Sequence, residues 1–169
     1  MKNIVLTGFM GVGKTEVGRE LSTILGWKLL DVDDEIVKSQ KMSVSEIFSR
    51  FGEAVFRDLE TEMIRKVSRK RNIVISTGGG AVLRQENMEL LKTHGVVVCL
   101  TALPETILKR TSRNNERPLL QVEDPLKRIH DLLELRKPFY ENADIVIGTE
   151  GESPLRIAEE ILERMGWKR

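Results

Sequence analysis

Short apolar runs alternate with longer amphipathic stretches along most of this chain. The runs that we interpret as buried strands cover residues 4–6, 29–30, 73–75, 96–100 and 145–147. Continuous apolar runs separated by helical stretches are typical of parallel strands that are covered on both faces. The pattern therefore predicts an α/β fold of three layers, with helices on both faces of a short five-stranded parallel sheet.

Two stretches do not fit a simple alternation of strand and helix. Residues 34–70 read as helical throughout, whereas residues 112–123 do not read as helical. Three helix starts carry capping signals, namely Ser43 with Glu46, Asp124 before Pro125, and Ser153 before Pro154. A length of 169 residues suits one domain, which we expect to cover residues 1–169.

Composition limits the classes of partner. The 27 Lys and Arg residues nearly balance the 26 Asp and Glu residues, which predicts neither nucleic acid nor a membrane as a main partner. No apolar run approaches the roughly 20 residues that a membrane-spanning helix needs. Cys99 is the only cysteine and lies in the run 96–100, so we interpret it as a buried strand thiol in a reducing compartment. We therefore expect a cytoplasmic protein.

Residues 8–15, with the sequence GFMGVGKT, carry the clearest chemical signal. Glycines at this spacing let backbone N–H groups turn inward around a phosphate, and the following helix N-terminus adds partial positive charge. Lys14 would then reach the β- and γ-phosphates, and the Thr15 hydroxyl would ligate Mg²⁺. The alternative is a glycine-rich turn with an incidental lysine, but the placement between a strand and a helix favours a phosphate-binding loop.

The carboxylates that follow the run 29–30 are candidates for the metal and the acceptor. If the chain stays extended, Asp31 and Asp33 point the same way, so that Asp31 could serve Mg²⁺ while Asp33 faces an acceptor. Alternatively, these acids only cap the helix that follows. Their place at the carboxyl end of a strand favours a ligand site, because open α/β sheets bind ligands there.

Glycines 78–80 follow the run 73–75. They could form a flexible turn, but a backbone without side chains also lets a ligand approach main-chain N–H groups closely. Combined with the phosphate-binding loop and the two acids, they predict one cleft.

Three arginines complete the candidate site, although each taken singly reads as surface charge. Arg57 lies on a helical stretch, and Glu60 three residues later could hold its guanidinium in place. Arg117 lies in a polar stretch suited to a mobile lid. Arg136 lies near a helix end, where basic residues also occur because of the helix dipole.

Six motifs occur in the order seen in shikimate kinases. They are GFMGVGKT at 8–15, DVD at 31–33, FRDLE at 56–60, STGGG at 76–80, ERPLL at 116–120 and RKPFY at 136–140. The phosphate-binding loop is generic, but the combination is specific to that family and covers essentially the whole chain. The chain thus resembles shikimate kinases, which have the nucleoside monophosphate kinase-like P-loop fold. These enzymes use ATP and Mg²⁺ to phosphorylate the 3-hydroxyl of shikimate in aromatic amino-acid biosynthesis.

The resemblance implies a role for each candidate residue. The residues that would bind ATP are Gly11, Val12, Gly13, Lys14, Thr15, Glu16, Arg110 and Arg117, and those that would bind one Mg²⁺ are Thr15 and Asp31, the latter directly or through water. The residues that would bind shikimate are Asp33, Arg57, Gly78, Gly79, Gly80 and Arg136.

The resemblance also implies how these residues would act. Arg57 and Arg136 would bind the shikimate carboxylate, and Gly79 would be the most direct backbone donor. Asp33 would take the proton of the attacking hydroxyl, while Lys14 and Arg117 would neutralise charge on the moving phosphoryl group. A helical substrate-binding region at about 33–61 and a lid at about 112–124 would complete a monomeric enzyme.

Two features depart from many relatives. Glu16 stands where many relatives carry a second hydroxyl residue, and the loop 148–153 is acidic where some place an arginine beside adenine. Contacts on the adenine side are therefore not carried over to this chain.

Other nucleotide-binding classes explain the sequence less well. A regulatory GTPase needs a guanine-reading NKxD element, which this sequence lacks. A gluconate-type kinase has less use for two arginines and three glycines beside the acceptor. A nucleoside monophosphate kinase binds an acceptor phosphate, which Asp33 would repel. A binding module without catalysis has no reason to keep both an acceptor carboxylate and a lid arginine.

Overall fold

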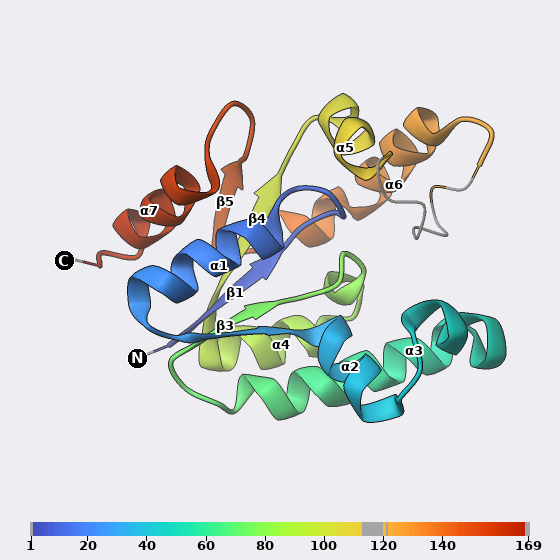
Figure 1. The fold of residues 1–169 in the computed structure, drawn as a ribbon, viewed down its shortest axis with the longest axis horizontal. Coiled ribbons are helices and arrows are strands. Elements are labelled where there is room, and N and C mark those ends of the chain that lie inside the picture. The colour runs from blue at the N-terminus through green and yellow to red at the C-terminus, as the bar shows by residue number, and fades with distance from the viewer. Residues whose placement is uncertain (1, 113–119, 121, 168–169) are drawn as a thin grey trace.

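A parallel sheet of five strands in the order β2-β3-β1-β4-β5 forms the centre of the structure (Figure 1). The structure is a computed structural model that describes residues 2–112, 120 and 122–167. The strands are β1 (Asn3–Thr7), β2 (Lys28–Asp31), β3 (Ile73–Ser76), β4 (Gly95–Thr101) and β5 (Ile145–Gly148). Each predicted strand is confirmed, because every apolar run lies inside one of these strands.

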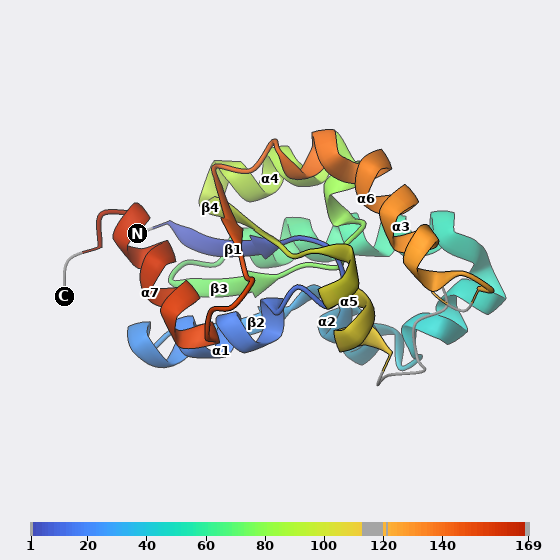
Figure 2. The ribbon, with the colours of Figure 1, turned by 90° about the horizontal axis from the view of Figure 1, so that it is seen from above.

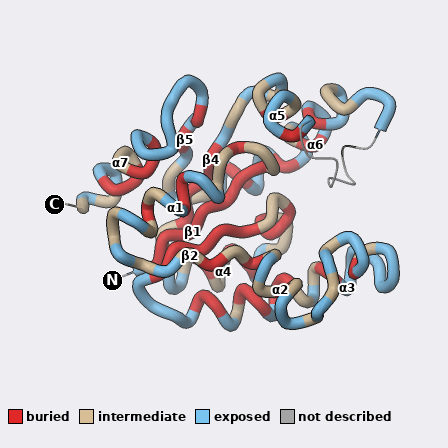
Figure 3. The backbone as a smooth tube through the Cα atoms, viewed as in Figure 1, coloured by how far each residue is buried: buried red, intermediate tan, exposed pale blue. Residues whose placement is uncertain are grey.

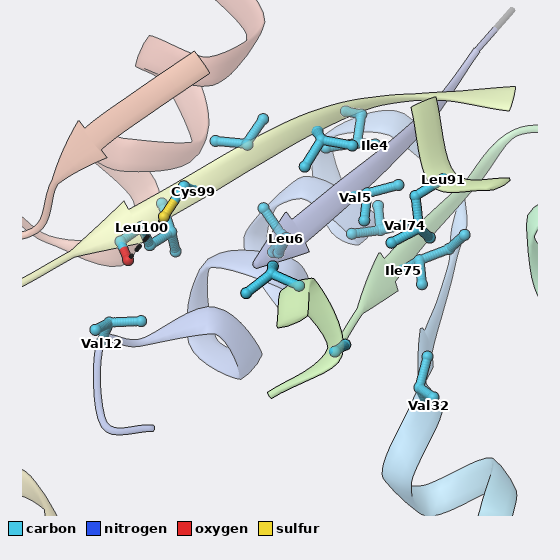
Figure 4. Packing of buried hydrophobic residues seen from close by; sticks show 14 of the residues in the cluster. Ile4, Val5, Leu6, Val12, Val32, Val74, Ile75, Leu91, Cys99 and Leu100 are labelled. Atoms are coloured by element: carbon cyan, nitrogen blue, oxygen red, sulfur yellow. Dashed lines mark hydrogen bonds between the residues drawn. The ribbon is translucent and has the colours of Figure 1, made fainter. Parts of the chain in front are cut away.

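Strand β1 lies in the middle of the sheet and is buried along its whole length. Figure 4 shows its side chains Ile4, Val5 and Leu6 among apolar side chains of the neighbouring strands. Cys99 on β4 is fully buried, which confirms the predicted strand thiol. An apolar strand at this position has neighbours on both sides and on both faces, as a parallel sheet requires.

Helices cover both faces of the sheet, which confirms the predicted three layers (Figure 2). The helices are α1 (Lys14–Leu25), α2 (Val32–Gln40), α3 (Val44–Ser68), α4 (Gln85–His94), α5 (Pro104–Thr111), α6 (Pro125–Tyr140) and α7 (Pro154–Arg164), with a short 3₁₀ helix η1 (Ala81–Leu83). Helices α1 and α7 pack together on one face, and α3 and α4 pack together on the other. Buried residues follow the strands and the inward faces of the helices (Figure 3). In the described part of the chain, no helix is both long and apolar enough to cross a membrane.

The expectation of continuous helix over residues 34–70 is wrong at two points. Helix α2 ends where Lys41 takes a left-handed φ of 54°, and α3 begins after Ser43, whose side chain forms the predicted capping box with Glu46. Within α3, Gly52 has φ 85° and ψ 169°, which is not helical and produces a kink. The chain therefore turns twice, and these turns bring α2 and α3 against each other.

Candidate active site

The loop after β1 has the glycine geometry that its sequence predicts. Gly8, Gly11 and Gly13 all have positive φ, at 129°, 78° and 100°. A Cβ on Gly8 would lie 2.2 Å from the carbonyl oxygen of Leu100, so a side chain does not fit at that position. Gly13 is the N-cap of α1, which places the loop around the N-terminus of that helix. Such a loop presents backbone N–H groups to an anion.

Lys14 lies over this loop. Its Nζ donates hydrogen bonds to the carbonyl oxygens of Gly8 and Phe9, both at 2.8 Å. The ammonium group is thus held above the phosphate-binding loop, on the side where a bound phosphate would lie. Thr15 and Glu16, in the first turn of α1, are exposed beside it.

A cavity of about 820 Å³ opens over the loop. Across from the loop it is lined by residues of α5 and of the segment after β5, which are Thr106, Lys109, Arg110, Thr149, Glu150, Gly151, Glu152, Pro154 and Ile157. Arg110 donates to the carbonyl of Gly11 at 3.3 Å and to the hydroxyl of Thr149 at 3.2 Å, so it bridges the two sides. No sequence motif predicted the part played by Thr149, because it lies far from the loop along the chain.

The acids Asp31 and Asp33 do not both lie on extended chain, as the expectation that they point the same way required. Asp31 is extended, but α2 already begins at Val32, so Asp33 lies in the first turn of that helix. The Oδ1 atom of Asp31 accepts hydrogen bonds from the backbone N–H groups of Asp33 at 3.0 Å and Asp34 at 3.3 Å. Asp31 therefore caps α2 through its Oδ1 atom. Both Asp31 and Asp33 nevertheless face the cavity over the loop.

Asp33 has the properties of a base that titrates near neutral pH. Its Oδ1 is buried and has no hydrogen-bond partner among the described residues. Burial, together with the neighbouring carboxylates of Asp31 and Glu60, raises the pKa of Asp33 to about 7. The cations of Lys14 and Arg57 oppose this shift only in part. A carboxyl group with such a pKa suits proton transfer at neutral pH.

Arg57 is held by two carboxylates. Its Nη1 donates to Glu60 Oε2 at 2.8 Å and its Nη2 to Glu53 Oε1 at 3.1 Å. Glu60 is fully buried, which raises the pKa of its carboxyl group, while the Arg57 charge lowers it. The predicted pairing of Arg57 with Glu60 is confirmed. Gly80 packs directly on the same guanidinium, because a Cβ there would lie 2.4 Å from Nη2.

Arg136 is buried, although its sequence position also suited surface charge. It is 5% exposed, and its guanidinium lies 5.6 Å from the centre of the Phe9 ring. Its Nε is buried without a hydrogen-bond partner in the described part of the chain. Tyr140, one turn later on α6, donates a hydrogen bond to the Gly79 carbonyl at 2.8 Å. Phe9 and Tyr140 had no predicted role, although both lie in the motifs at 8–15 and 136–140 and Tyr140 follows Arg136 by four residues on one helix.

A second cavity of about 690 Å³ brings these groups together. Its polar lining includes Asp33, Arg57, Glu60, Gly78, Gly79, Gly80 and Arg136, and its apolar wall includes Val44, Phe48 and Phe56. The two cavities share Met10, Thr15, Asp31, Asp33, Gly78 and Gly79. The predicted convergence of loop, acids and glycines is thus present. Arg117, like most of the stretch 112–124, lies outside the described residues.

These observations define a class of protein. A phosphate-binding loop faces one cavity, while Asp33 and the arginines Arg57 and Arg136 face the adjoining one. Together with the sheet order, this arrangement is that of a P-loop kinase that acts on a small anionic acceptor.

The chain belongs to the shikimate kinase family, whose family model matches residues 10–166. It is 53% identical to the shikimate kinase of Thermodesulfovibrio yellowstonii over 163 residues, which cover 96% of this chain and 94% of that protein. The structure of shikimate kinase from Acinetobacter baumannii in complex with shikimate superposes with a TM-score of 0.94 at 40% identity, covering 98% of this chain and 93% of that one. A gluconokinase from Sinorhizobium meliloti shares only the fold, with a TM-score of 0.61 at 17% identity over 97% of this chain and 93% of that one.

Proposed function

We propose that this chain transfers the γ-phosphate of ATP to the 3-hydroxyl of shikimate, giving shikimate 3-phosphate and ADP. The observation that carries the proposal is the junction of the two cavities, where Thr15, Asp33 and Gly79 line both of them. A nucleotide in one cavity and an acceptor in the other would meet at Asp33. The family to which the chain belongs supplies the identity of the acceptor.

The charges of the second cavity suit the two ends of shikimate. Arg57 and Arg136 would bind its carboxylate, because a guanidinium offers two parallel N–H groups to a carboxylate. The buried Nε of Arg136, which lacks a partner among the described residues, supports this assignment. The backbone of Gly78, Gly79 and Gly80 would line the ring of the acceptor, with Gly79 as its most direct donor.

The first cavity would hold the nucleotide. Gly11, Val12 and Gly13 would offer backbone N–H groups to the phosphates. Lys14 would reach the β- and γ-phosphates from its place over the loop. Arg110 and Glu16 would border the rest of the nucleotide.

The donor set at the junction fits Mg²⁺. The Thr15 hydroxyl and the Asp31 carboxylate are hard oxygen ligands, and Mg²⁺ commonly takes one or two such groups together with waters and substrate phosphates. Within the described residues, no cluster of three or more His, Cys, Asp or Glu side chains could hold a metal alone. When bound, Mg²⁺ would neutralise charge on the phosphates.

The transfer would need one proton acceptor and several cations. The 3-hydroxyl oxygen of shikimate bonds to the γ-phosphorus as the bond to the β,γ-bridging oxygen breaks, and Asp33 takes the hydroxyl proton. Lys14 and Arg117 would neutralise the charge that spreads over the phosphoryl oxygens. Water must be excluded during this step, because otherwise ATP would be hydrolysed, and a lid at 112–124 that carries Arg117 would meet this need.

The proposal extends to the organisation of the enzyme. Residues 1–169 would act as one domain and as a monomer in the cytoplasm, with residues 33–61 as the substrate-binding region. Nucleic acid and membranes would play no part, since the chain has a formal net charge of only +1.

Asp33→Asn tests the proposed base. This variant keeps the shape of the side chain but cannot take the proton, so phosphorylation of shikimate should fall at least about 100-fold. Binding of Mg·ATP, measured by calorimetry, should change little. Asp34→Asn, at an exposed acid in the same helical turn, is the matched control and should retain turnover. Wild-type turnover by Asp33→Asn would remove Asp33 from the mechanism.

A further inference from the structure

The hydroxyl of Tyr140 connects two elements that both line the acceptor cavity. It donates a hydrogen bond to the carbonyl of Gly79 at 2.8 Å, from a position 61 residues away along the chain. Tyr140 is the last residue of α6 and is only 6% exposed. A buried side chain at the end of this helix thus holds the glycine turn that follows β3.

This hydrogen bond also fixes the direction of a backbone donor. The carbonyl of Gly79 and the N–H of Gly80 belong to one planar trans peptide group, so they point in opposite directions. A donor that holds the carbonyl therefore sets the direction of the N–H. Other groups confine the same peptide: a Cβ on Gly79 would lie 3.3 Å from the Gly8 carbonyl, and one on Gly80 would lie 2.4 Å from Arg57 Nη2.

The turn of α6 that carries Tyr140 is weakened by a proline. Pro138 lies inside the helix and has no N–H, so it cannot donate to the carbonyl of Glu134. Arg136 lies in this same turn. Because the backbone holds this turn less firmly, the hydrogen bond from Tyr140 to Gly79 is well placed to keep Arg136 against the sheet.

The Tyr140 hydroxyl keeps its proton throughout the neutral range. Burial raises the pKa of Tyr140 to about 12, and the nearby Arg136 guanidinium lowers it only in part. A protonated phenol remains a donor, so the contact with the Gly79 carbonyl persists at every pH at which the enzyme would work.

We infer that Tyr140 is a positioning residue for the acceptor, whose hydroxyl holds the Gly79–Gly80 peptide and the Arg136 turn in the arrangement that receives shikimate. It acts through the Gly79–Gly80 peptide, whose N–H is that of Gly80, and through the Arg136 turn, rather than by contact with the reacting atoms. The inference rests on the proposed function, because that function assigns the second cavity to shikimate.

Tyr140→Phe tests this role, since it removes only the hydroxyl. The KM for shikimate should rise about tenfold, the effect of losing one buried hydrogen bond, while the KM for Mg·ATP should change less than about twofold. Phe139→Leu is the matched control, because Phe139 is the preceding residue of the same turn and is 40% exposed. It should change neither constant. An unchanged shikimate KM in Tyr140→Phe, or an equal rise in both constants, overturns the inference.

A second measurement serves if Tyr140→Phe does not fold. Tyr140 is the only tyrosine in the chain, so growth with 3-fluorotyrosine places a single fluorine label at this site. Its ¹⁹F signal should shift on saturation with shikimate and shift less with Mg·ADP, and no response to shikimate overturns the inference.

Turnover of shikimate by the wild-type protein separates the proposed function from the inference about Tyr140. If the wild type does not phosphorylate shikimate, the proposed function and the inference fail together; if it does, the results at Tyr140 decide the inference alone.

Discussion

Gly80→Ala tests whether the position of Arg57 determines acceptor binding. Gly80 has φ −96° and ψ −4°, which any L-residue adopts, so alanine adds one methyl group without backbone strain. That Cβ would lie 2.4 Å from Arg57 Nη2 and 2.7 Å from Cζ. Favourable carbon contacts begin at about 3.5 Å, so the guanidinium must move by about 1 Å.

The effect on binding follows from this displacement. The guanidinium is the flexible end of a long side chain, so it can move away from the added methyl group without a shift of the backbone. Its hydrogen bond to Glu60, and those that we propose to the shikimate carboxylate, depend on its position. A hydrogen bond to a charged group contributes about 1.5–3 kcal/mol, so its loss should raise the KM for shikimate about 10- to 150-fold.

Steady-state kinetics with each substrate varied in turn would measure this effect. The KM for Mg·ATP should change little, whereas the melting temperature should fall by about 2–4 °C for each kcal/mol lost from the disturbed ion pair with the buried Glu60. Gly148→Ala is the matched control, because it lies in β5 and its nearest neighbour for an added Cβ is Thr101 Oγ1 at 3.9 Å. A folded Gly80→Ala variant with a wild-type shikimate KM would refute the reasoning.

Four further predictions concern Arg136, Asp33 and Arg117. Arg136→Lys should raise the KM for shikimate, because a point charge replaces a bidentate donor, and an unchanged KM would show that Arg136 does not bind the carboxylate. The kcat/KM for shikimate should rise with pH around a midpoint near 7, where Asp33 ionises, and a flat profile from about pH 6 to 8 would count against Asp33 as the base. The pKa of Asp33 in the folded protein, about 7, exceeds the ordinary value of 3.8, so the folded protein becomes less stable as the pH rises from about 4 to 7. Asp33→Asn removes this loss and should therefore raise the melting temperature more at pH 8 than at pH 5. Arg117→Ala should lower kcat more than it weakens nucleotide binding, and a pure loss of nucleotide affinity would argue against its role in the lid.

The strands and the phosphate-binding loop could be predicted because their signals are local. Each strand is an apolar run that can be recognised from neighbouring residues alone, and the positive φ angles of Gly8, Gly11 and Gly13 follow from a known motif. The capping box of Ser43 and Glu46 marks a helix start, but the left-handed turn at Lys41 that precedes it carries no such signal. A lysine rarely takes a left-handed φ, and here the packing of α2 against α3 favours that turn over continued helix.

In the site, too, local features could be predicted and contacts between distant segments could not. The pairing of Arg57 with Glu60 follows from helical spacing, and the cap formed by Asp31 follows from residue type. The burial of Arg136 and the contact of Tyr140 with Gly79 depend on how α6 meets the turn after β3. Contacts between segments that are distant in sequence leave no periodic or spacing signal. The raised pKa of Asp33 could not be predicted either, because it depends on burial and on charges such as that of Glu60.

The central claim is that the second cavity selects shikimate as the phosphoryl acceptor. ADP release from Mg·ATP by the purified protein, measured with shikimate, gluconate and a panel of nucleoside monophosphates, tests it most directly. We expect strong stimulation by shikimate alone. Stimulation by gluconate or a nucleotide with none by shikimate would contradict the account.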